Sequence, residues 1–574
     1  MSGIDQASAE VMTEKFLTVE EAAKRLGVST ATVKRRARDG SINAVKSGRN
    51  WVIYEDGLPV QPANLVRRAA ETASALVDLP TALQHLKNQD LGRDIWIPDV
   101  LRFADDLINP TVLRDEAAAR IDNALLLAPA TPIPVPKSPI FLRNAVNLAL
   151  PDRLAYHAVV LAMAPTLDAL IGEEAYAARL GTGHKFLKSL RAFARWKSAV
   201  RAHAEAAGGY VIETDVTAFF DCINHTVLMR EVRDAGVPAP LANTLSQMLK
   251  RWQVAPNTGL PQGPDASRLL ANFYMRAIDD VMTRIPGIAY FRYMDDVRII
   301  ASTRHLAISA LHEFDDECKK RNLVLSTKKT ELKTAAEAIK ASRDSDLNAV
   351  KYAFDTDETS TEVRKSLSAL FRGALKSDGT VNATRARFSL YRLFKLREKR
   401  VLRDVLKNLE TVAGLGWNVA AYIAPWITAP EVGDRLADYF EDPERNTGGY
   451  LSSWLLAAIA DEPTSATPRI VDYARTKAFD SSTPSSQRAI AMQVAAIGRT
   501  PSDIAKLQAV IDREYDPEVV RGALVALRRI DKLDRSVTDR ARRIAGMQGT
   551  VDYLRQSDDL PSMIFGELRA RRVS

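Results

Sequence analysis

Two adjacent carboxylates, Asp295 and Asp296, interrupt an apolar and strand-prone run, which reads AYFRYMDDVRIIA at residues 289–301. Aromatic residues precede the pair and the branched residues Ile299 and Ile300 follow it. We therefore expect a strand on each side and a hairpin tip at the aspartates. Paired carboxylates at such a tip suit hard divalent cations, which take oxygen ligands. Aspartate is also common in ordinary turns, so this stretch alone leaves a metal site and a plain turn both open.

Three further stretches, read together with the stretch around Asp295 and Asp296, form an ordered set of motifs. Residues 210–221 read YVIETDVTAFFD and place Asp215 at the end of a strand-prone run; residues 259–272 read GLPQGPDASRLLAN; residues 323–332 read LVLSTKKTEL. The four stretches occur in the order, and at roughly the spacing, of motifs A, B, C and D of reverse transcriptases. Residues 75–335 thus resemble the core of that family, and four ordered motifs are far more specific than any one of them.

The resemblance implies two-metal nucleotidyl transfer. Asp215, Asp295 and Asp296, together with Val216, are the residues that it assigns to two Mg²⁺ ions, which Mn²⁺ could replace. One ion would lower the pKa of an attacking 3′-hydroxyl, and the other would hold the triphosphate of a deoxynucleotide. Three clustered carboxylates repel one another without metal, so we expect Mg²⁺ to stabilise the protein.

A second group of residues is expected to bind the nucleotide. The residues that the resemblance assigns are Arg143, Phe220, Gln262, Gly263 and Lys329. The ring of Phe220 would exclude a 2′-hydroxyl, although core packing is its alternative explanation. Lys329, or the adjacent Lys328, would neutralise or protonate the leaving pyrophosphate. Arg143 would lie near the triphosphate or be a structural surface cation, and Asp221 is interpreted as structural.

The N-terminal stretch 16–54 carries helix-start signals. Thr18 with Glu21 forms a capping box, Ser29 caps a second helix, and residues 51–54 predict a short strand or wing. The stretch resembles the helix-turn-helix of excisionase-like and MerR-like DNA-binding domains, whose second helix enters a groove. The candidate contacts are Thr30, Lys34, Arg35 and Arg38. A helical interaction module with a merely solvated basic face is the alternative.

Two basic stretches lie inside the polymerase-like region. Residues 184–201 predict a basic amphipathic helix, and residues 385–407 carry a dense basic stripe at the place of a thumb helix. Either could track a nucleic-acid backbone by neutralising phosphates, or could simply be solvated. The candidate contacts are Lys188, Arg191, Arg195, Arg392, Lys395 and Lys399. Residues 128–137, APATPIPVPK, are interpreted as a proline-rich break, and residues 350–354 as a strand.

The 574 residues predict a multidomain α+β protein. We expect a right-hand polymerase core with fingers, palm and thumb, a small N-terminal helix-turn-helix, and a C-terminal all-helical region. Amphipathic stretches recur there every few tens of residues, which favours HEAT-like repeats, with an irregular bundle as the alternative. The predicted boundaries are helix-turn-helix 1–56, linker 57–77, fingers 78–209, palm 210–335, thumb or connection 336–410 and helical repeats 411–574.

The composition of the chain limits the partners, the cysteine-based sites and the cellular compartment that we expect. A net charge of +8 and a pI near 9.2 suit a nucleic-acid partner without establishing one. The two cysteines, Cys222 and Cys318, form no CxxC motif, so neither a zinc site nor a disulfide framework is expected. No apolar run is long enough to span a bilayer and no signal peptide is apparent, so we expect a soluble, cytoplasmic protein without a membrane partner.

A polymerase core followed by a helical region resembles the abortive-infection and unknown-group reverse transcriptases of bacterial antiphage defence. This resemblance implies deoxynucleotides and an RNA or DNA template or product as partners, with a non-coding RNA and a homo-oligomer through the C-terminal region as further candidates. Priming by a nucleic acid or by a protein side chain stays open. The alternatives are a mobile-retroelement enzyme, of the retron or group II type, and a catalytically inert nucleic-acid-binding scaffold.

Overall fold

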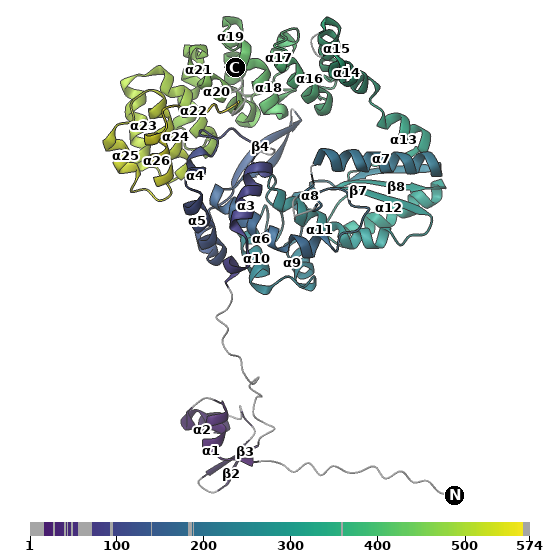
Figure 1. Cartoon of the computed structure of the whole chain (residues 1–574), viewed down its shortest axis with the longest axis vertical. Helices are drawn as coiled ribbons and strands as arrows, with labels where there is room; N and C mark the ends of the chain where they lie inside the picture. The colour runs from purple at the N-terminus through teal and green to yellow at the C-terminus, as the bar shows by residue number, and fades with distance from the viewer. Residues whose placement is uncertain are drawn as a thin grey trace. The chain divides into compact units, whose positions relative to one another are not determined.

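The structure is a computed structural model, and it describes residues 16–26, 29–38, 42, 44–47, 50–54, 72–91, 96–138, 140–181, 186–187, 189–357 and 360–565. The chain divides into two compact units, residues 1–71 and 72–574 (Figure 1). Within the described ranges, none of the helices combines the length and the apolarity needed to cross a bilayer.

The first unit contains two short helices and a three-stranded antiparallel sheet of order β1-β3-β2. Its elements are β1 Phe16–Leu17, α1 Val19–Leu26, α2 Thr30–Arg38, β2 Ala44–Ser47 and β3 Asn50–Tyr54. The predicted capping box is present, because the backbone N–H of Thr18 donates to Glu21 at 2.8 Å and that of Glu21 donates to the Thr18 hydroxyl at 3.2 Å. Ser29 accepts from the backbone of Thr32 at 3.2 Å, as expected for the second cap. Buried Ala22, Val33 and Ile53 join the helices to the sheet.

The palm of the second unit is a four-stranded antiparallel sheet of order β7-β8-β6-β9. Its strands are β6 Tyr210–Asp215, β7 Ile288–Tyr293, β8 Asp296–Ala301 and β9 Glu331–Thr334. Side chains alternate between the two faces of a strand. Val211 and Ile300 therefore face α7 (Ser189–Ala207) and α13 (Ala335–Ser342), and their neighbours Ile212 and Ile299 belong to the core under α11 (Asp265–Met282) and α12 (Arg304–Lys319). Helices α7 and α12 lie on opposite sides of β7 and β8 in Figure 1.

The fingers combine helices with a two-stranded hairpin. The helices are α3 Leu79–His85, α5 Pro110–Asp122 and α6 Leu150–Asp168, and the hairpin pairs β4 Thr131–Ser138 with β5 Phe141–Asn147. Helix α10 (Ala239–Arg251), from the palm stretch of the chain, packs on α6. The expected proline-rich break at 128–137 is therefore wrong over most of its length. Pro132, Pro134 and Pro136 occupy every second position, and alternate residues of an antiparallel edge strand direct their N–H groups away from the partner. Proline at those positions removes no hydrogen bond of the ladder.

Two other local predictions differ from the structure. Residues 350–354 are not a strand but part of α14 (Ser345–Thr356), which Asp344 caps by accepting from the backbone of Leu347 at 2.9 Å. Leu347, Val350 and Phe354 recur with helical spacing, and that period outweighs the β propensity of a short window. At the end of the expected linker, Ala73–Leu76 forms a 3₁₀ turn, and the hydroxyl of Ser74 within this turn donates to Asp122 of α5 at 2.6 Å.

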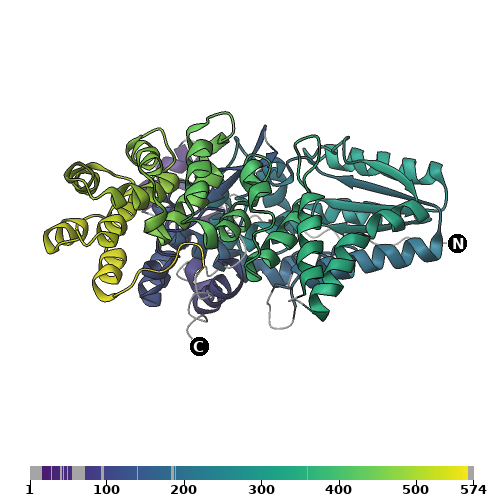
Figure 2. The same cartoon turned by 90° about the horizontal axis from the view of Figure 1, so that it is seen from above.

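Beyond the palm the second unit is helical. After α15 (Thr361–Arg372) come α16 Ala383–Lys395, α17 Leu402–Lys407, α18 Gly416–Ile423, α19 Pro430–Glu441, α20 Tyr450–Asp461, α21 Pro468–Phe479, α22 Ser485–Ala495, α23 Pro501–Arg513, α24 Pro517–Arg529, α25 Arg535–Ala541 and α26 Gln548–Gln556. Even-numbered helices from α16 to α26 pack on one another in succession, and α17 packs on α19 and α19 on α21. Figures 1 and 2 show these helices as a continuous arc. The first residue of four of them is proline, which suits a position whose N–H has no partner in the helix.

One apolar core runs through this helical region and into the fingers. It includes Phe371 and Leu390 before residue 411 and Leu455 and Val525 after it, together with Val135 of the finger hairpin. The helices that were expected as thumb and as repeat region thus share their buried side chains. This continuity brings the C-terminal helices against the hairpin that carries Arg143.

Candidate active site

The aspartate pair lies at a hairpin tip, as the sequence predicts. Tyr293 of β7 pairs with Asp296 of β8, which leaves Met294 and Asp295 as the turn, and Met294 has a positive φ of 58°. Across the sheet, Asp215 at the end of β6 pairs with Asp296. Because β6 and β8 are adjacent and antiparallel, the end of one strand meets the start of the other, and this brings the three carboxylates to one edge of the palm.

Burial and mutual repulsion disfavour the charged forms of these carboxylates. Burial raises the pKa of Asp295 to about 6, and the negative charge of Asp215 adds to the effect. Burial also raises the pKa of Asp296, against the attraction of Arg298, whose guanidinium lies 3.8 Å from the Asp296 carboxylate. The ammonium of Lys329 lies 2.7 Å from Oδ2 of Asp215, and its side chain is about half exposed. Negative charge therefore concentrates at this edge, and Lys329 offsets part of it.

The donor set fits a hard divalent cation. Asp215 and Asp295 offer carboxylate oxygens, and their repulsion is of the kind that a cation relieves. In the described part of the chain, no three His, Cys, Asp or Glu side chains are gathered closely enough to count as a metal cluster. The ammonium of Lys329 forms an ion pair with Asp215 and so places a positive charge beside the carboxylates of Asp215 and Asp295. The assignment of Asp215, Val216, Asp295 and Asp296 to metal binding stays a prediction.

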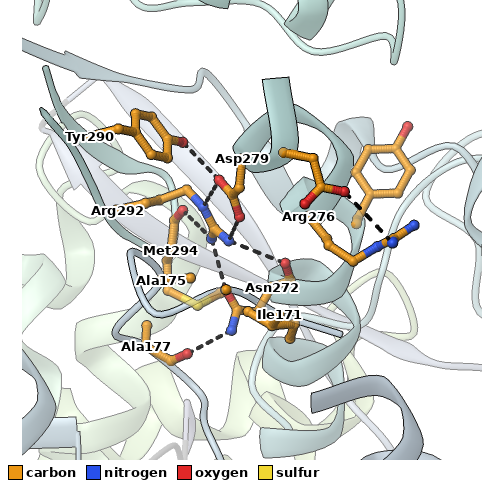
Figure 3. A network of polar contacts seen from close by, with 12 residues as sticks. Ile171, Ala175, Ala177, Asn272, Arg276, Asp279, Tyr290, Arg292 and Met294 are labelled. Carbon is orange, nitrogen blue, oxygen red and sulfur yellow. Dashed lines mark hydrogen bonds and ion pairs between the residues drawn. The ribbon is translucent and has the colours of Figure 1, made fainter. Parts of the chain in front are cut away.

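A buried arginine that the sequence analysis missed supports the hairpin tip (Figure 3). Arg292 of β7 is fully buried and donates from Nε and Nη2 to the two oxygens of Asp279 in α11, at 2.8 and 2.5 Å. Its Nη1 donates to Oδ1 of Asn272 at 2.8 Å and to the backbone carbonyl of Met294 at 3.1 Å. Burial works against the charged guanidinium, but the charge and hydrogen bonds of Asp279 outweigh it and raise the pKa of Arg292. The carbonyl of Met294 connects this ion pair directly to the turn that carries Asp295.

A cavity of about 870 Å³ opens in front of Asp215 and Asp295, whereas Asp296 is not among the residues that line it. The palm, the fingers and the helical region all contribute to its walls. The residues from palm and fingers include Asp215, Val216, Phe220, Asp221, Gln262, Gly263, Asp295, Lys329, Lys137, Phe141 and Arg143. Those from the helical region include Arg387, Trp417, Tyr450, Trp454 and Phe565. The structure thus brings every residue predicted to bind the nucleotide into one cavity, while their individual roles stay predictions.

The cavity wall also contains residues that were not predicted to bind the nucleotide. Asp221, interpreted as structural, lines the cavity and accepts a hydrogen bond from Nε2 of Gln262 at 3.0 Å. Burial raises the pKa of Asp221, and the hydrogen bond of Gln262 opposes that shift. Phe220 is half-buried and packs edge-to-face on Phe219, so its ring both packs and faces the cavity. The aromatic wall from the helical region carries no signal in the motif spacing, because its first residue, Trp417, already lies 82 positions beyond the end of the palm at residue 335.

The predicted nucleic-acid contacts differ in their surroundings. In the first unit, Lys34, Arg35 and Arg38 are exposed on α2, as a groove-binding helix requires. In α7, Arg191 and Arg195 are exposed whereas Trp196 is buried; the helix begins at Ser189, five residues later than expected, and Lys188 lies outside the described residues.

The expected basic helix at 385–407 is interrupted, because α16 ends at Lys395 and α17 begins at Leu402. Lys395 and Lys399 are exposed, but Arg392 lies over the rings of Phe388 and Phe354, at 3.5 and 4.9 Å from their centroids. Arg392 is thus a half-buried packing residue rather than a free surface cation.

Comparison with known proteins identifies two domains. Residues 147–363, which contain all four motifs, match the family described as reverse transcriptase (RNA-dependent DNA polymerase), and residues 16–58 match a helix-turn-helix domain family. The chain therefore carries a reverse-transcriptase domain behind an N-terminal helix-turn-helix domain. This match confirms the reverse-transcriptase domain that the four motifs predict.

A curated relative and two solved structures are similar at a distance. The protein YkfC of Escherichia coli (strain K12) is 25% identical over 261 residues, which cover 37% of this chain and 66%, just under two thirds, of that protein. Apo telomerase from Candida tropicalis aligns over 60% of this chain and 69% of its own, with 10% identity and a TM-score of 0.30. Telomerase from Candida albicans in complex with a fragment of telomeric RNA aligns over 55% of each chain, with 12% identity and a TM-score of 0.24. TM-scores of this size are too low for a conclusion about fold or function.

Proposed function

We propose that this protein is an RNA-directed DNA polymerase that adds deoxynucleotides to a 3′-hydroxyl. One observation carries the proposal: residues from motifs A, B, C and D, separated by up to a hundred positions and more, line a single cavity in the region that matches the reverse-transcriptase family. Cavities of several hundred Å³ are the size of a small-molecule site, so this one can hold a nucleotide.

Each part of the cavity has a distinct task in this reaction. When bound, Mg²⁺ would activate the 3′-hydroxyl and neutralise the charge of the triphosphate. Asp215 and Asp295 would hold the two Mg²⁺ ions at the palm edge. Arg143 of the finger hairpin would orient the phosphates. Lys329, whose ammonium lies 2.7 Å from Oδ2 of Asp215, would neutralise or protonate the departing pyrophosphate.

Gln262 of motif B and Phe220 of motif A would then determine which nucleotide binds. Gln262 is held by Asp221 at 3.0 Å, so its amide is oriented before a substrate arrives. The ring of Phe220 would lie where a 2′-hydroxyl of the sugar would otherwise fit, which favours deoxynucleotides. Arg191 and Arg195 of α7 and Lys395 and Lys399 near α16 are the exposed cations proposed to neutralise template or product phosphates.

A primer-extension assay with Mg²⁺ or Mn²⁺ tests the proposal. The purified full-length protein should extend an annealed DNA primer on an RNA template, and Asp295→Asn/Asp296→Asn should abolish extension while leaving the circular dichroism spectrum unchanged. Lys329→Ala should slow incorporation, whereas the matched change Lys328→Ala at the adjacent exposed lysine should not. Full extension by the double aspartate variant would show that the palm carboxylates do not carry the chemistry.

The cellular role proposed here is antiphage defence, on the strength of the architecture. A reverse-transcriptase domain continuous with a helical region resembles the abortive-infection class, and the packing of successive helices supports the HEAT-like reading of that region. Cells that carry the gene should survive phage challenge better than cells that carry Asp215→Ala. Protection that is indifferent to Asp215→Ala would instead favour a catalytically inert scaffold.

A further inference from the structure

A tryptophan outside the four motifs contacts the motif B loop. The indole Nε1–H of Trp96 donates to the backbone carbonyl of Gln262 at 3.0 Å. The next residue, Gly263, has a φ of +134°, and a Cβ placed on it would lie 2.8 Å from the same Nε1. Any side chain at Gly263 would therefore displace the indole, and the indole in turn fixes the position of the loop against the cavity.

The C-terminal helices hold this tryptophan in place. The buried indole of Trp454 in α20 donates to the backbone carbonyl of Trp96 at 3.2 Å. A Cβ placed on Gly416 at the start of α18 would lie 2.5 Å from Nε1 of Trp454, so this second indole is also closely confined. Two indoles in series thus connect the helical region to the carbonyl of Gln262, and Trp96, Trp454 and Gln262 all line the catalytic cavity.

An ion pair anchors the same finger segment a few residues later. Asp99 accepts from Nη1 and Nη2 of Arg521 in α24, at 2.5 and 2.8 Å, and also accepts from the backbone of Leu101 and Phe103. Arg521 in addition pairs with buried Asp105 at 2.6 Å. The segment that begins at Trp96 is therefore fixed to the helical region at two points, α20 and α24, while its indole reaches into the palm.

We propose that Trp96 is a positioning residue for nucleotide binding, and that Trp454 of the helical region holds it in that position. The inference rests on the proposed polymerase function. Without the indole donor, the carbonyl of Gln262 loses its partner and the loop is free to move, which disturbs the hydrogen bond between Gln262 and Asp221. The helical region then contributes to the affinity for the incoming nucleotide and not only to stability.

Phenylalanine substitutions test the relay, because they keep an aromatic ring and remove the N–H donor. The variants are Trp96→Phe, Trp454→Phe and their combination, with Trp252→Phe as the matched control. Trp252 is buried and donates to the carbonyl of Ala128 at the same 3.0 Å, but it does not line the cavity. For each variant, steady-state primer extension gives KM and kcat for the deoxynucleotide. The rise in Tm caused by deoxynucleotide with Ca²⁺ gives binding without turnover.

We expect Trp96→Phe to raise KM several-fold to about tenfold with a smaller effect on kcat, since the net contribution of one hydrogen bond corresponds to that range. Trp454→Phe should raise KM less, and the double variant no more than Trp96→Phe, because both changes act on one loop. Trp252→Phe should lower Tm and leave KM unchanged. An unchanged KM and nucleotide-induced Tm shift in Trp96→Phe, or an equal change in Trp252→Phe, would overturn the relay. If the unaltered protein does not extend primers, the polymerase proposal fails, and the nucleotide-induced Tm shift still decides the relay.

Discussion

Replacing Asp279 by alanine should destabilise the palm severely and misplace its catalytic turn. The carboxylate of Asp279 accepts three hydrogen bonds, two from Arg292 and one from the hydroxyl of Tyr290 at 2.8 Å. Asp279 and Arg292 are both fully buried. The change Asp279→Ala therefore leaves a guanidinium without its counter-charge inside the core, where water cannot replace the lost partner.

The expected loss is about 3–5 kcal/mol in the free energy of unfolding, which is the usual cost of removing one partner from a buried ion pair. The assay is urea unfolding followed by circular dichroism, compared with the matched change Arg469→Ala. Arg469 pairs with Asp438 and Glu441 on the surface, with all three side chains nearly half exposed. Exposed pairs contribute at most about 1 kcal/mol, so this control should change little.

Two further results separate charge from packing. The double variant Asp279→Leu/Arg292→Met should recover part of the lost stability, since it removes the stranded charge together with its partner. It should not recover primer extension, because the carbonyl of Met294 no longer accepts a hydrogen bond from Nη1 of Arg292. A loss in Asp279→Ala no larger than that in Arg469→Ala, or full activity in the double variant, would refute the reasoning.

Two other predictions concern the cavity itself. Phe220→Ala should raise the ratio of ribonucleotide to deoxynucleotide incorporation, measured as kcat/KM, by roughly tenfold or more, because the ring that blocks a 2′-hydroxyl is gone; an equal fall for both substrates would leave Phe220 as packing only. The pKa of Asp295 is raised to about 6 in the folded protein from a usual 3.8, so without metal its contribution to stability is greatest at low pH and is lost as the pH rises through about 6. Conversely, the rise in Tm caused by Mg²⁺ should grow between pH 5 and pH 7, since the ion needs the ionised carboxylate. Asp295→Asn should weaken both the pH dependence of stability without metal and the pH dependence of the Mg²⁺-induced rise in Tm. Equal pH profiles for the unaltered protein and for Asp295→Asn would contradict this prediction.

Local sequence signals predicted the elements of the palm and of the helical region with good accuracy. The strand at residues 210–215 and the hairpin around Asp295 occur where propensity and turn chemistry place them. The recurring amphipathic stretches expected after residue 411 correspond to helices of the described part of this region. Such signals involve residues that are close together in the chain, so they can be recognised from a single sequence without the tertiary structure.

Failures occurred where local signals conflict. Residues 350–354 have strand-like composition, yet the apolar period of the longer window is helical and the surrounding helices bury that face. Residues 131–138 contain three prolines, yet pairing with β5 and packing of Val135 in the core of the helical region make them a strand. In both cases a tertiary contact decided between two locally acceptable conformations.

The order and spacing of the motifs are linear properties of the chain, so they predict which residues could carry out the chemistry before any fold is known. The contacts that hold those residues in place arise only when distant segments pack together. The pairing of Arg292 with Asp279 joins a strand to a helix. Trp96 contacts Gln262, which lies 166 positions away in the sequence, and Trp454, which lies 358 positions away. Neither set has a local signature, because a buried ion pair or an indole hydrogen bond depends on which surfaces meet when the chain packs, and not on the residues beside it in the sequence.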